Sequence, residues 1–291
     1  MRGVARRPTA RELNALRAWY RPRRRAYPWR RARPDPYAVL VSEVMLQQTQ
    51  APRVVPVFER FVARFPTVRS LARASRPDVI RAWAGLGYNR RAVALHGAAI
   101  AIEDEHGGRV PVAMEALLRL PGVGPYTASA VASIAFGAAI PALDVNVRRV
   151  VARVTRGCDP QDLGSDDLAA AAGAFMDRED PGSWNQALMD LGRELCRPVP
   201  RCDACPLQSR CRFRAAGHPS GTPLRRRSPF EGSARQVRGR IVATLRERPS
   251  VDLAALVAAA GASEPRVIAA IDGLLRDGIL QRAGRRYRLH R

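Results

Sequence analysis

The sequence predicts an all-α protein that ends in a small module of helices and a hairpin. Helical hydrophobic periodicity runs through the middle of the chain, period-two alternation is almost absent there, and short Pro/Gly breaks separate the periodic segments. The chain has 291 residues, 46% of them hydrophobic, so it exceeds one average domain and can bury a sizeable core. We expect the all-α domain to end near residue 215.

The expected helices follow one another closely. Breaks such as Phe65-Pro66-Thr67 and His106-Gly107-Gly108 end one helix before the next begins. In chain order, the expected helices are Glu12–Tyr20, Pro36–Gln50, Pro52–Phe65, Arg76–Ala84, Arg90–Asp104, Met114–Arg119, Pro125–Phe136, Asn146–Val154, Asp166–Met176 and Trp184–Cys196.

Residues 216–233 have the Pro, Gly, Ser and Arg content of a linker. Three helices and a hairpin are expected in residues 234–291, which suggests a winged-helix-like, DNA-binding module whose last helix could enter a major groove. Small helical caps give the same pattern. The expected helices are Arg235–Arg246, Leu253–Ala259 and Pro265–Asp277, and the expected strands are Ile279–Arg282 and Arg285–His290.

The charge of the chain points to a polyanionic partner. All 49 Lys+Arg residues are arginine, against 26 acids, for a net charge of +23. Residues 1–33 hold 12 arginines and one acid, and residues 234–291 hold 12 arginines and five acids. GC-rich coding explains arginine in place of lysine but not the excess of positive charge. Because the arginine fork suits phosphate contacts, we expect nucleic acid as the partner.

No window of about 18 consecutive apolar residues is present, so we expect no membrane span. Residues 1–33 lack the apolar stretch and cleavage site of a secretory signal. We expect a cytoplasmic protein, associated with the nucleoid if the source is bacterial.

Four cysteines after the last expected helix have the spacing of a metal centre. They read C-x5-C-x2-C-x5-C, so four thiolates can converge on one site. In an intracellular chain this favours metal over disulfides. Zinc and a [4Fe–4S] cluster both take four cysteines, and the spacing alone leaves both open. The four residues are Cys196, Cys202, Cys205 and Cys211.

A second motif, LPGVG at 120–124, joins two expected helices. A glycine pair that opens a helix lets backbone N–H groups approach a phosphate, and the helix N-terminus favours an anion. Any tight helix–helix turn can have this composition. In so basic a chain, Gly122, Val123 and Gly124 are candidate DNA contacts of a helix-hairpin-helix.

Two carboxylates have unusual surroundings. Glu43 lies inside the apolar helical run VLVSEVMLQQTQ, where an acid is costly unless it has a role or a partner. Asp144 precedes the helix expected at Asn146, and it could simply cap that helix. Each has an ordinary structural explanation when taken alone, whereas together with the cysteines and the hairpin they form a recognisable set.

These segments resemble the adenine DNA glycosylase branch of the helix-hairpin-helix (HhH-GPD, endonuclease III-like) DNA glycosylase superfamily, over about residues 10–214. The resemblance implies a DNA cleft between a six-helix lobe, about 30–137, and a lobe made by the N-terminal helix with 138–215. It also implies a [4Fe–4S] cluster on the four cysteines. The matching stretches are PWR at 28–30, PYAVLVSEVMLQQTQ at 36–50, RFPT at 64–67, GLGY at 85–88, LPGVGPYTA at 120–128, LDVNVRRV at 143–150 and WNQALMDLG at 184–192.

The resemblance also implies catalytic roles. Glu43 matches the general acid that protonates adenine so that the base can leave. Asp144 matches the carboxylate that stabilises, or transiently bonds, the oxocarbenium sugar. One carboxyl group must therefore stay protonated in a dry pocket while the other stays ionised. Tyr126 and Asn146 match residues that support this site.

Further matches concern DNA and a cation. Gln48 and Tyr88 match the wedge that enters the base stack as the target base leaves it. The carbonyls of Leu118, Leu120 and Val123 match a site for a monovalent cation.

Strand cleavage through a lysine Schiff base is excluded, because the chain contains no lysine. Tyr126 stands where the bifunctional members of the superfamily have that lysine. Only the terminal amine is left as a primary amine, so we expect a monofunctional enzyme.

The chain departs from the family pattern in four places. The first cysteine gap is five residues, where the family usually has six. Asn89 replaces a second tyrosine after GLGY, and Val145 replaces a glycine beside Asp144. The 58 residues from 234 to 291 are too short and too helical to supply the family's C-terminal Nudix-like domain, which reads 8-oxoguanine.

The expected activity is removal of adenine opposite 8-oxoguanine or guanine by a monomer acting on mismatched or lesion-containing double-stranded DNA. An alternative is a glycosylase for thymine or uracil opposite guanine, because Tyr126 also occurs in that branch. Glu43 discriminates between them, since adenine needs protonation to leave whereas a pyrimidine can leave as an anion. A non-catalytic DNA-binding protein is the third possibility, and the presence of both Glu43 and Asp144 argues against it.

Overall fold

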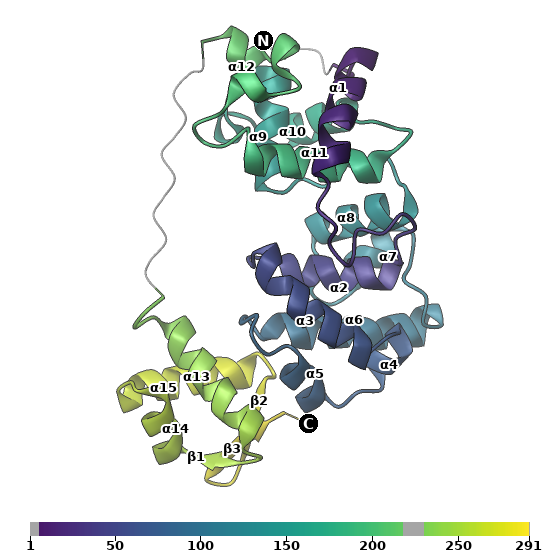
Figure 1. Ribbon diagram of the computed structural model, residues 1–291. Helices are drawn as coiled ribbons and strands as arrows, with labels where there is room; N and C mark the ends of the chain where they lie inside the picture. Colours follow the sequence, from purple (N-terminus) through teal and green to yellow (C-terminus); the bar gives the residue numbers. More distant parts are fainter. Residues whose placement is uncertain (1–5, 218–229, 291) are drawn as a thin grey trace. The chain divides into compact units, whose positions relative to one another are not determined.

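The computed structural model describes residues 6–217 and 230–290 and is mainly helical (Figure 1). It forms two compact units. Among the described residues, the first unit comprises 6–40, 112–118 and 123–217, and the second comprises 41–111, 119–122 and 230–290. Helices α2 (Pro36–Leu46) and α7 (Met114–Arg119) contribute residues to both units.

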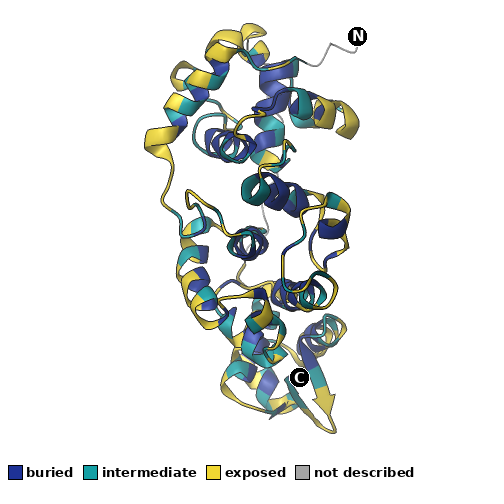
Figure 2. Ribbon diagram, turned by 90° about the vertical axis from the view of Figure 1, so that its right-hand side faces the viewer, coloured by how far each residue is buried: buried dark blue, intermediate teal, exposed yellow. Residues whose placement is uncertain are grey.

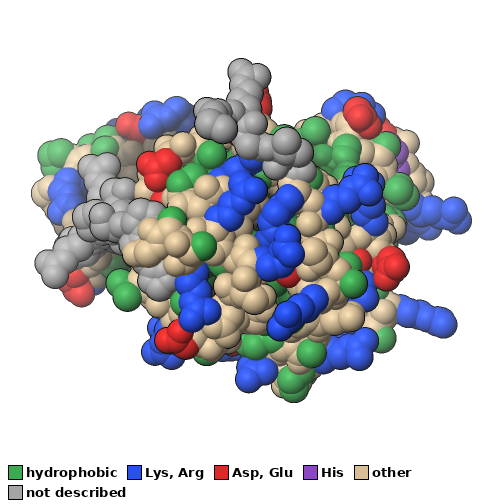
Figure 3. Space-filling view, turned by 90° about the horizontal axis from the view of Figure 1, so that it is seen from above, with side chains coloured by type: hydrophobic (Ala, Val, Ile, Leu, Met, Phe, Trp, Pro, Cys, Tyr) green, Lys and Arg blue, Asp and Glu red, His purple; other side chains and the backbone are tan. Residues whose placement is uncertain are grey.

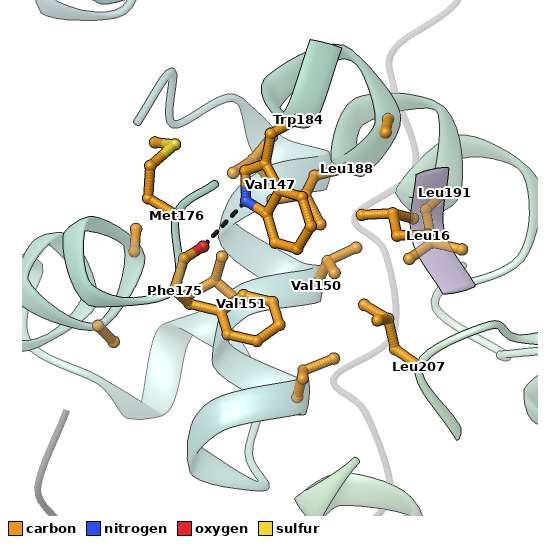
Figure 4. Close-up of a cluster of buried hydrophobic side chains, with 14 of the residues drawn as sticks. Leu16, Val147, Val150, Val151, Phe175, Met176, Trp184, Leu188, Leu191 and Leu207 are labelled. Carbon is orange, nitrogen blue, oxygen red and sulfur yellow. Dashed lines mark hydrogen bonds between the residues drawn. The ribbon is translucent and has the colours of Figure 1, made fainter. Parts of the chain in front are cut away.

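The first unit is a set of helices around one hydrophobic cluster (Figure 4). Val147, Val150 and Val151 of α9 pack there with side chains of α1, α10 and α11. The Trp184 indole N–H donates to the Phe175 carbonyl at 2.9 Å, which satisfies the one polar atom of this buried ring. The helices are α1 (Ala10–Tyr20), α8 (Pro125–Phe136), α9 (Val145–Val151), α10 (Ser165–Ala174), α11 (Pro181–Glu194) and α12 (Arg212–Ala215).

Local sequence explains where several of these helices begin. Thr9 and Glu12 form a capping box at the start of α1, with each side chain bound to the other residue's backbone N–H. Pro125 and Pro181 occupy the first turns of α8 and α11, where the missing N–H has no intrahelical partner to lose. Figure 2 shows buried residues (dark blue) along one side of many helices and exposed residues (yellow) along the other.

The second unit joins two segments that are distant in sequence. The helices from its first part are α3 (Ala51–Arg64), α4 (Val68–Ala72), α5 (Arg76–Ala82) and α6 (Arg90–His106). Its second part contains α13 (Ala234–Glu247), β1 (Val251–Asp252), α14 (Leu253–Ala260), α15 (Glu264–Arg276), β2 (Leu280–Ala283) and β3 (Arg286–Leu289). We call residues 230–290 the C-terminal module.

The C-terminal module has winged-helix topology. Its strands are antiparallel in the order β1-β3-β2, with Val251 opposite Tyr287 and Leu280 opposite Leu289. The three predicted helices and the hairpin are present, whereas the two-residue strand β1 was not predicted. The predicted linker 216–233 lies largely outside the described residues.

Side chains of α5 and α6 complete the core of the C-terminal module. Ile80 is fully buried in a cluster with side chains of α13, α14 and α15, and Val93 packs against the same cluster. Arg246 of α13 donates to the Ile80 carbonyl at 3.1 Å and to the Asn89 side-chain oxygen at 2.9 Å. Asn89, which departs from the family pattern, is therefore a docking contact for α13.

Several predicted boundaries were wrong. The helix expected at Pro36–Gln50 ends at Leu46, because Gln48 adopts φ 56°, which is left-handed and cannot continue a right-handed helix. The helix expected at Asn146–Val154 changes to a π turn at Ala152–Arg156. The short helix α4 was not expected at all.

Within the described residues, no single helix has both the length and the apolar character needed to cross a membrane. By length and composition only, the pair Leu253–Ala260 and Glu264–Arg276, bent by 106°, passes the same test when taken together.

Candidate functional site

Asp144 is the N-cap of α9 in the first unit. Its Oδ1 accepts hydrogen bonds from the backbone N–H groups of Asn146 at 2.9 Å and Val147 at 2.7 Å, and its Oδ2 accepts one from Asn146 Nδ2 at 2.9 Å. Burial raises the pKa of Asp144 above its ordinary value, while these donors and the Arg149 cation oppose the rise. The capping role and a catalytic role are thus compatible in one side chain.

Arg149 extends this network towards the cysteine segment. Its guanidinium donates to the Asn146 side-chain oxygen at 2.9 Å, to the Gly192 carbonyl at 2.7 Å and to the Cys196 carbonyl at 2.6 Å. A Cβ on Gly192 would lie 2.6 Å from the Asn146 Cβ, so glycine is needed for α11 to approach α9 this closely. The orientation of the Asp144 carboxylate is therefore connected, through two side chains, to the loop that begins at Cys196.

Tyr126 lies in the first turns of α8, also in the first unit, and is half-buried. Its hydroxyl lies 4.0 Å from Met189 Sδ. The neighbouring segment of α8 is fixed by Asn185, which donates to the Ser133 hydroxyl at 2.7 Å and to the Ile140 carbonyl at 2.9 Å.

Glu43 lies in α2 and belongs to the second unit. The side chain is 5% exposed, and its neighbours Ser42 and Val44 are 0% and 1% exposed. Glu43 is therefore buried within the second unit, and its role as a general acid stays a prediction.

The hairpin between α7 and α8 depends on Gly122. This residue has φ 76°, and a Cβ there would lie 2.6 Å from the Ala94 Cβ. Val123 is buried, while Gly124 is the N-cap of α8 and has no side-chain hydrogen bond. Exposed backbone at the start of α8 has the geometry for contacting an anion. The cation site at the carbonyls of Leu118, Leu120 and Val123 stays a prediction.

Gln48 and Tyr88 share an unusual backbone conformation. Among the described residues they are the two non-glycine residues with positive φ, at 56° and 45°. Both side chains are exposed. Strained, exposed residues of this kind concentrate at functional sites.

Arg91 holds the turns that contain Gln48 and Tyr88, and the sequence analysis did not identify it. This buried guanidinium donates to the carbonyls of Met45 at 2.7 Å and Gln47 at 2.6 Å, at the end of α2, and contacts the Gly87 carbonyl at 3.3 Å. Burial lowers the pKa of Arg91 to about 10. A buried arginine of this kind cannot be recognised from spacing, because its partners, mostly backbone carbonyls, come from the end of α2 and from two turns.

The four cysteines line one cavity in the first unit. Arg153, which is 1% exposed, lies against them, with its Nη1 at 3.9 Å from Cys196 Sγ and its Nε donating to Asp159 at 2.7 Å. Within the described residues, no three His, Cys, Asp or Glu side chains are grouped closely enough to hold a single metal ion. The structure therefore brings the four thiols to one cavity without forming a single-ion site.

Burial favours the protonated form of three thiols in this cavity, those of Cys196, Cys202 and Cys205. Burial raises the pKa of Cys205 to about 12 and also raises that of Cys196, where Arg153 and Arg149 oppose the shift. Two cations beside a buried sulfur stabilise a thiolate once a metal removes the proton. The donor set thus fits a thiolate-bound group.

Basic side chains cover much of the surface. Figure 3 shows a face on which arginines (blue) clearly outnumber acidic side chains (red), as the net charge of +23 requires. A surface of this sign attracts a polyanion over several ångströms and increases its association rate.

Comparison with known proteins identifies the class. Residues 41–163 match the model of the HhH-GPD superfamily base excision DNA repair proteins. The solved structure of a thermostable thymine-DNA glycosylase is similar, with a TM-score of 0.64 and 28% identity, covering 71% of this chain and 97% of that one. An endonuclease III–DNA complex has a TM-score of 0.58 at 23% identity, which shows a shared fold.

Curated relatives identify the family within that class. The adenine DNA glycosylase of Mycolicibacterium smegmatis is 41% identical over 268 residues, covering 91% of each chain. That of Mycobacterium tuberculosis is 42% identical over 279 residues, covering 92% of this chain and 89% of that protein. The human adenine DNA glycosylase is 43% identical over 229 residues but is matched over only 42% of its length. The chain belongs to the adenine DNA glycosylase family.

Proposed function

We propose that this protein is a monofunctional DNA glycosylase that flips adenine out of mismatched or lesion-containing DNA and hydrolyses its N-glycosidic bond. The observation that carries the proposal is the network that holds Asp144 at the start of α9, where its carboxylate accepts three hydrogen bonds. Glu43, the proposed acid, is buried in α2. Membership of the adenine DNA glycosylase family supports adenine as the substrate.

In this mechanism one carboxyl group is protonated and the other is ionised. Glu43 gives its proton to a ring nitrogen of adenine, so the base departs as a neutral molecule. Asp144 is ionised and stabilises the positive charge that develops on the sugar as the bond breaks. Asn146 donates to Asp144 Oδ2 and holds the carboxylate in orientation, and Tyr126 supports the same site. Water then adds to the sugar and releases a proton.

DNA binding is assigned to the hairpin and to the strained turns. The backbone of Gly122, Val123 and Gly124 contacts a phosphate at the N-terminus of α8. Gln48 and Tyr88 enter the space left in the base stack as the target base leaves it. We expect a monomer that acts in the cytoplasm on chromosomal DNA.

A [4Fe–4S] cluster is the group that we assign to the four cysteines, from the likeness to the adenine DNA glycosylase family. Cys196, Cys202, Cys205 and Cys211 line one cavity beside buried cations, and zinc takes the same four ligands. When bound, the cluster supplies a cross-link between distant points of the 196–211 loop. Arg153 and Arg149 hold the Cys196 end of that loop by hydrogen bonds to its carbonyls and sulfur. Iron and sulfide analysis of the purified protein tests the assignment.

The competing substrate is thymine or uracil opposite guanine. The likeness to a thymine-DNA glycosylase structure favours it, although identity there is 28%, against 41% and 42% to adenine DNA glycosylases over almost the whole chain. Glu43 has a function with adenine and none with a pyrimidine that leaves as an anion.

The test is a single-turnover assay with excess enzyme on duplexes that carry A:8-oxoguanine, A:G, A:C, T:G and U:G. Each product is split with and without alkali, because a monofunctional enzyme leaves an intact strand at the abasic site. We expect alkali-dependent cleavage at adenine and a loss of at least about 100-fold in rate for both Glu43→Gln and Asp144→Asn.

Two matched controls separate chemistry from folding. Glu105→Gln and Asp104→Asn remove carboxylates near the end of α6, away from the proposed site, and should leave the rate unchanged. Release of thymine or uracil in place of adenine would move the protein to the mismatch branch. Binding without any base release would contradict both enzymatic assignments.

A further inference from the structure

A groove of about 650 Å³ lies within the second unit, where α13 of the C-terminal module faces the turns that follow α2 and α5. Its volume is in the range of sites that hold ligands of drug or nucleotide size. Polar and charged side chains line much of it. They include Gln48, Arg53, Tyr88, Arg90, Arg235 and Arg238.

The groove contains both strained residues of the described chain. Gln48 and Tyr88, with φ 56° and 45°, come from different turns and line the same groove. Arg235 of α13 donates to the Tyr88 hydroxyl at 3.2 Å. The C-terminal module therefore contacts one of the two strained side chains directly.

The lining is strongly positive. The lining contains four arginines and one carboxylate, that of Asp277, which forms an ion pair with Arg238. Arg53 and Arg90 are exposed, and neither forms an ion pair with any residue that the structure describes. Exposed arginines without a protein carboxylate suit the phosphates of a nucleic-acid backbone.

The charge within the C-terminal module is unevenly distributed over its helices. Helix α15, the helix expected to enter a major groove, carries two arginines and two acids. Helix α13 carries four arginines and one glutamate, and its Arg235 and Arg238 line the groove. Of these two helices, α13 is therefore the more basic.

The position of α13 is fixed by packing. Ile80 is buried among the side chains of the module, and Arg246 donates to Ile80 O and to the Asn89 side chain. Asn89 directly follows Tyr88, so the contact that docks α13 adjoins the strained turn. The side of the groove that α13 forms is therefore held in place by buried packing.

We propose that the C-terminal module binds DNA through this groove, with Arg90 and Arg235 contacting backbone phosphates of the substrate duplex, and not through insertion of α15 into a major groove. The inference rests on the proposed function only in taking double-stranded DNA as the substrate. It assigns α13 to the same DNA-contacting surface as Gln48 and Tyr88.

The test measures binding and not excision. The probe is a duplex with a tetrahydrofuran abasic analogue opposite guanine, and its affinity for the full chain is measured from low to moderate salt. The affinity falls as salt rises, and each lost phosphate contact makes the slope of log K against log salt shallower by about 0.9. We expect that decrease for Arg90→Ala and for Arg235→Ala, and about 1.8 for the double variant.

The matched control is Arg285→Ala, which removes the same charge from the exposed turn between β2 and β3. It should leave the slope unchanged, and the melting temperature of every variant should match that of the parent. An unchanged slope in the double variant would overturn the proposal. An equal decrease of the slope for Arg285→Ala would also overturn it, because the turn between β2 and β3 would then contact a phosphate as well.

Neutral methylphosphonates placed in one strand at a time locate the contact. If the proposal holds, methylphosphonates in one of the two strands weaken binding of the parent more than binding of the double variant. Equal weakening of parent and double variant by both strands would overturn it. Because the probe contains no base to excise, a protein that binds in this way but releases no adenine would contradict the proposed function alone.

Discussion

At the scale of single residues, Asp144 experiences two opposing effects. Burial raises the pKa of its carboxyl group, while two backbone N–H groups, the Asn146 amide and the Arg149 cation lower it. The balance leaves the pKa above its ordinary value of 3.8. The ionised form that the mechanism requires is therefore lost at a higher pH than for a solvated aspartate.

This balance predicts a pH effect for Asn146→Ala. The substitution removes a donor to the ionised form, so the pKa of Asp144 rises further. As pH falls through that pKa the rate decreases, and we expect this acid limb of the single-turnover rate to move to higher pH in the variant. Asn14→Ala, on the exposed face of α1, is the control. An acid limb at the same pH in both variants would exclude this role for Asn146.

The residues of the candidate site differ in how far the sequence could predict them. Glu43 and Asp144 stand in motifs, so the resemblance located them and the structure adds their surroundings. The roles of Arg91 and Arg149 could not be predicted, because their carbonyl partners come from segments that are distant in the sequence. Long polar side chains bound to backbone can be identified only from tertiary structure.

At the scale of elements, the hairpin between α7 and α8 depends on one glycine more than on the other. Gly122 has φ 76° and no room for a Cβ beside Ala94. Gly124 is in the extended region, and a Cβ there would meet nothing within 4 Å. The sequence shows two equivalent glycines, whereas the backbone distinguishes them.

A pair of substitutions tests that distinction. Gly122→Ala should lower the free energy of unfolding by about 2–4 kcal/mol, from the left-handed backbone and the contact with Ala94. Gly124→Ala should change it by less than about 0.5 kcal/mol. Chemical denaturation of both variants gives the comparison, and similar losses in the two would show that the hairpin is not set by the Gly122 conformation.

Helix periodicity located most elements and failed at their ends. The type and order of the long helices follow from where apolar residues recur, and α6, α8 and α15 lie within about two residues of their expected bounds. The end of α2 could not be predicted, because it depends on Arg91, about 45 positions later in the chain, holding the carbonyls of Met45 and Gln47. The strand β1 was missed because two residues carry no periodicity.

At the scale of the whole molecule, the sequence predicted a separate C-terminal module but not its packing partner. A basic chain end after a linker-like stretch is typical of a tethered domain. In the structure, Ile80 and Val93 of the preceding helices belong to the core of that module. The sequence could not show this, because a buried isoleucine has the same pattern whichever apolar surface covers it.

The packing of the module predicts a long-range effect of Ile80→Ala. Ile80 is fully buried among side chains of α13, α14 and α15, so its truncation should cost about 2–5 kcal/mol of unfolding free energy. Because the cavity would open at the docking face, amide hydrogen exchange should become faster in α13 and α15 although the substitution is in α5. Ile100→Ala, on α6 and 37% exposed, should leave exchange in the module unchanged. If exchange in α13 were the same in both variants, the module would not be docked on α5 in solution, and the groove that α13 completes would be absent.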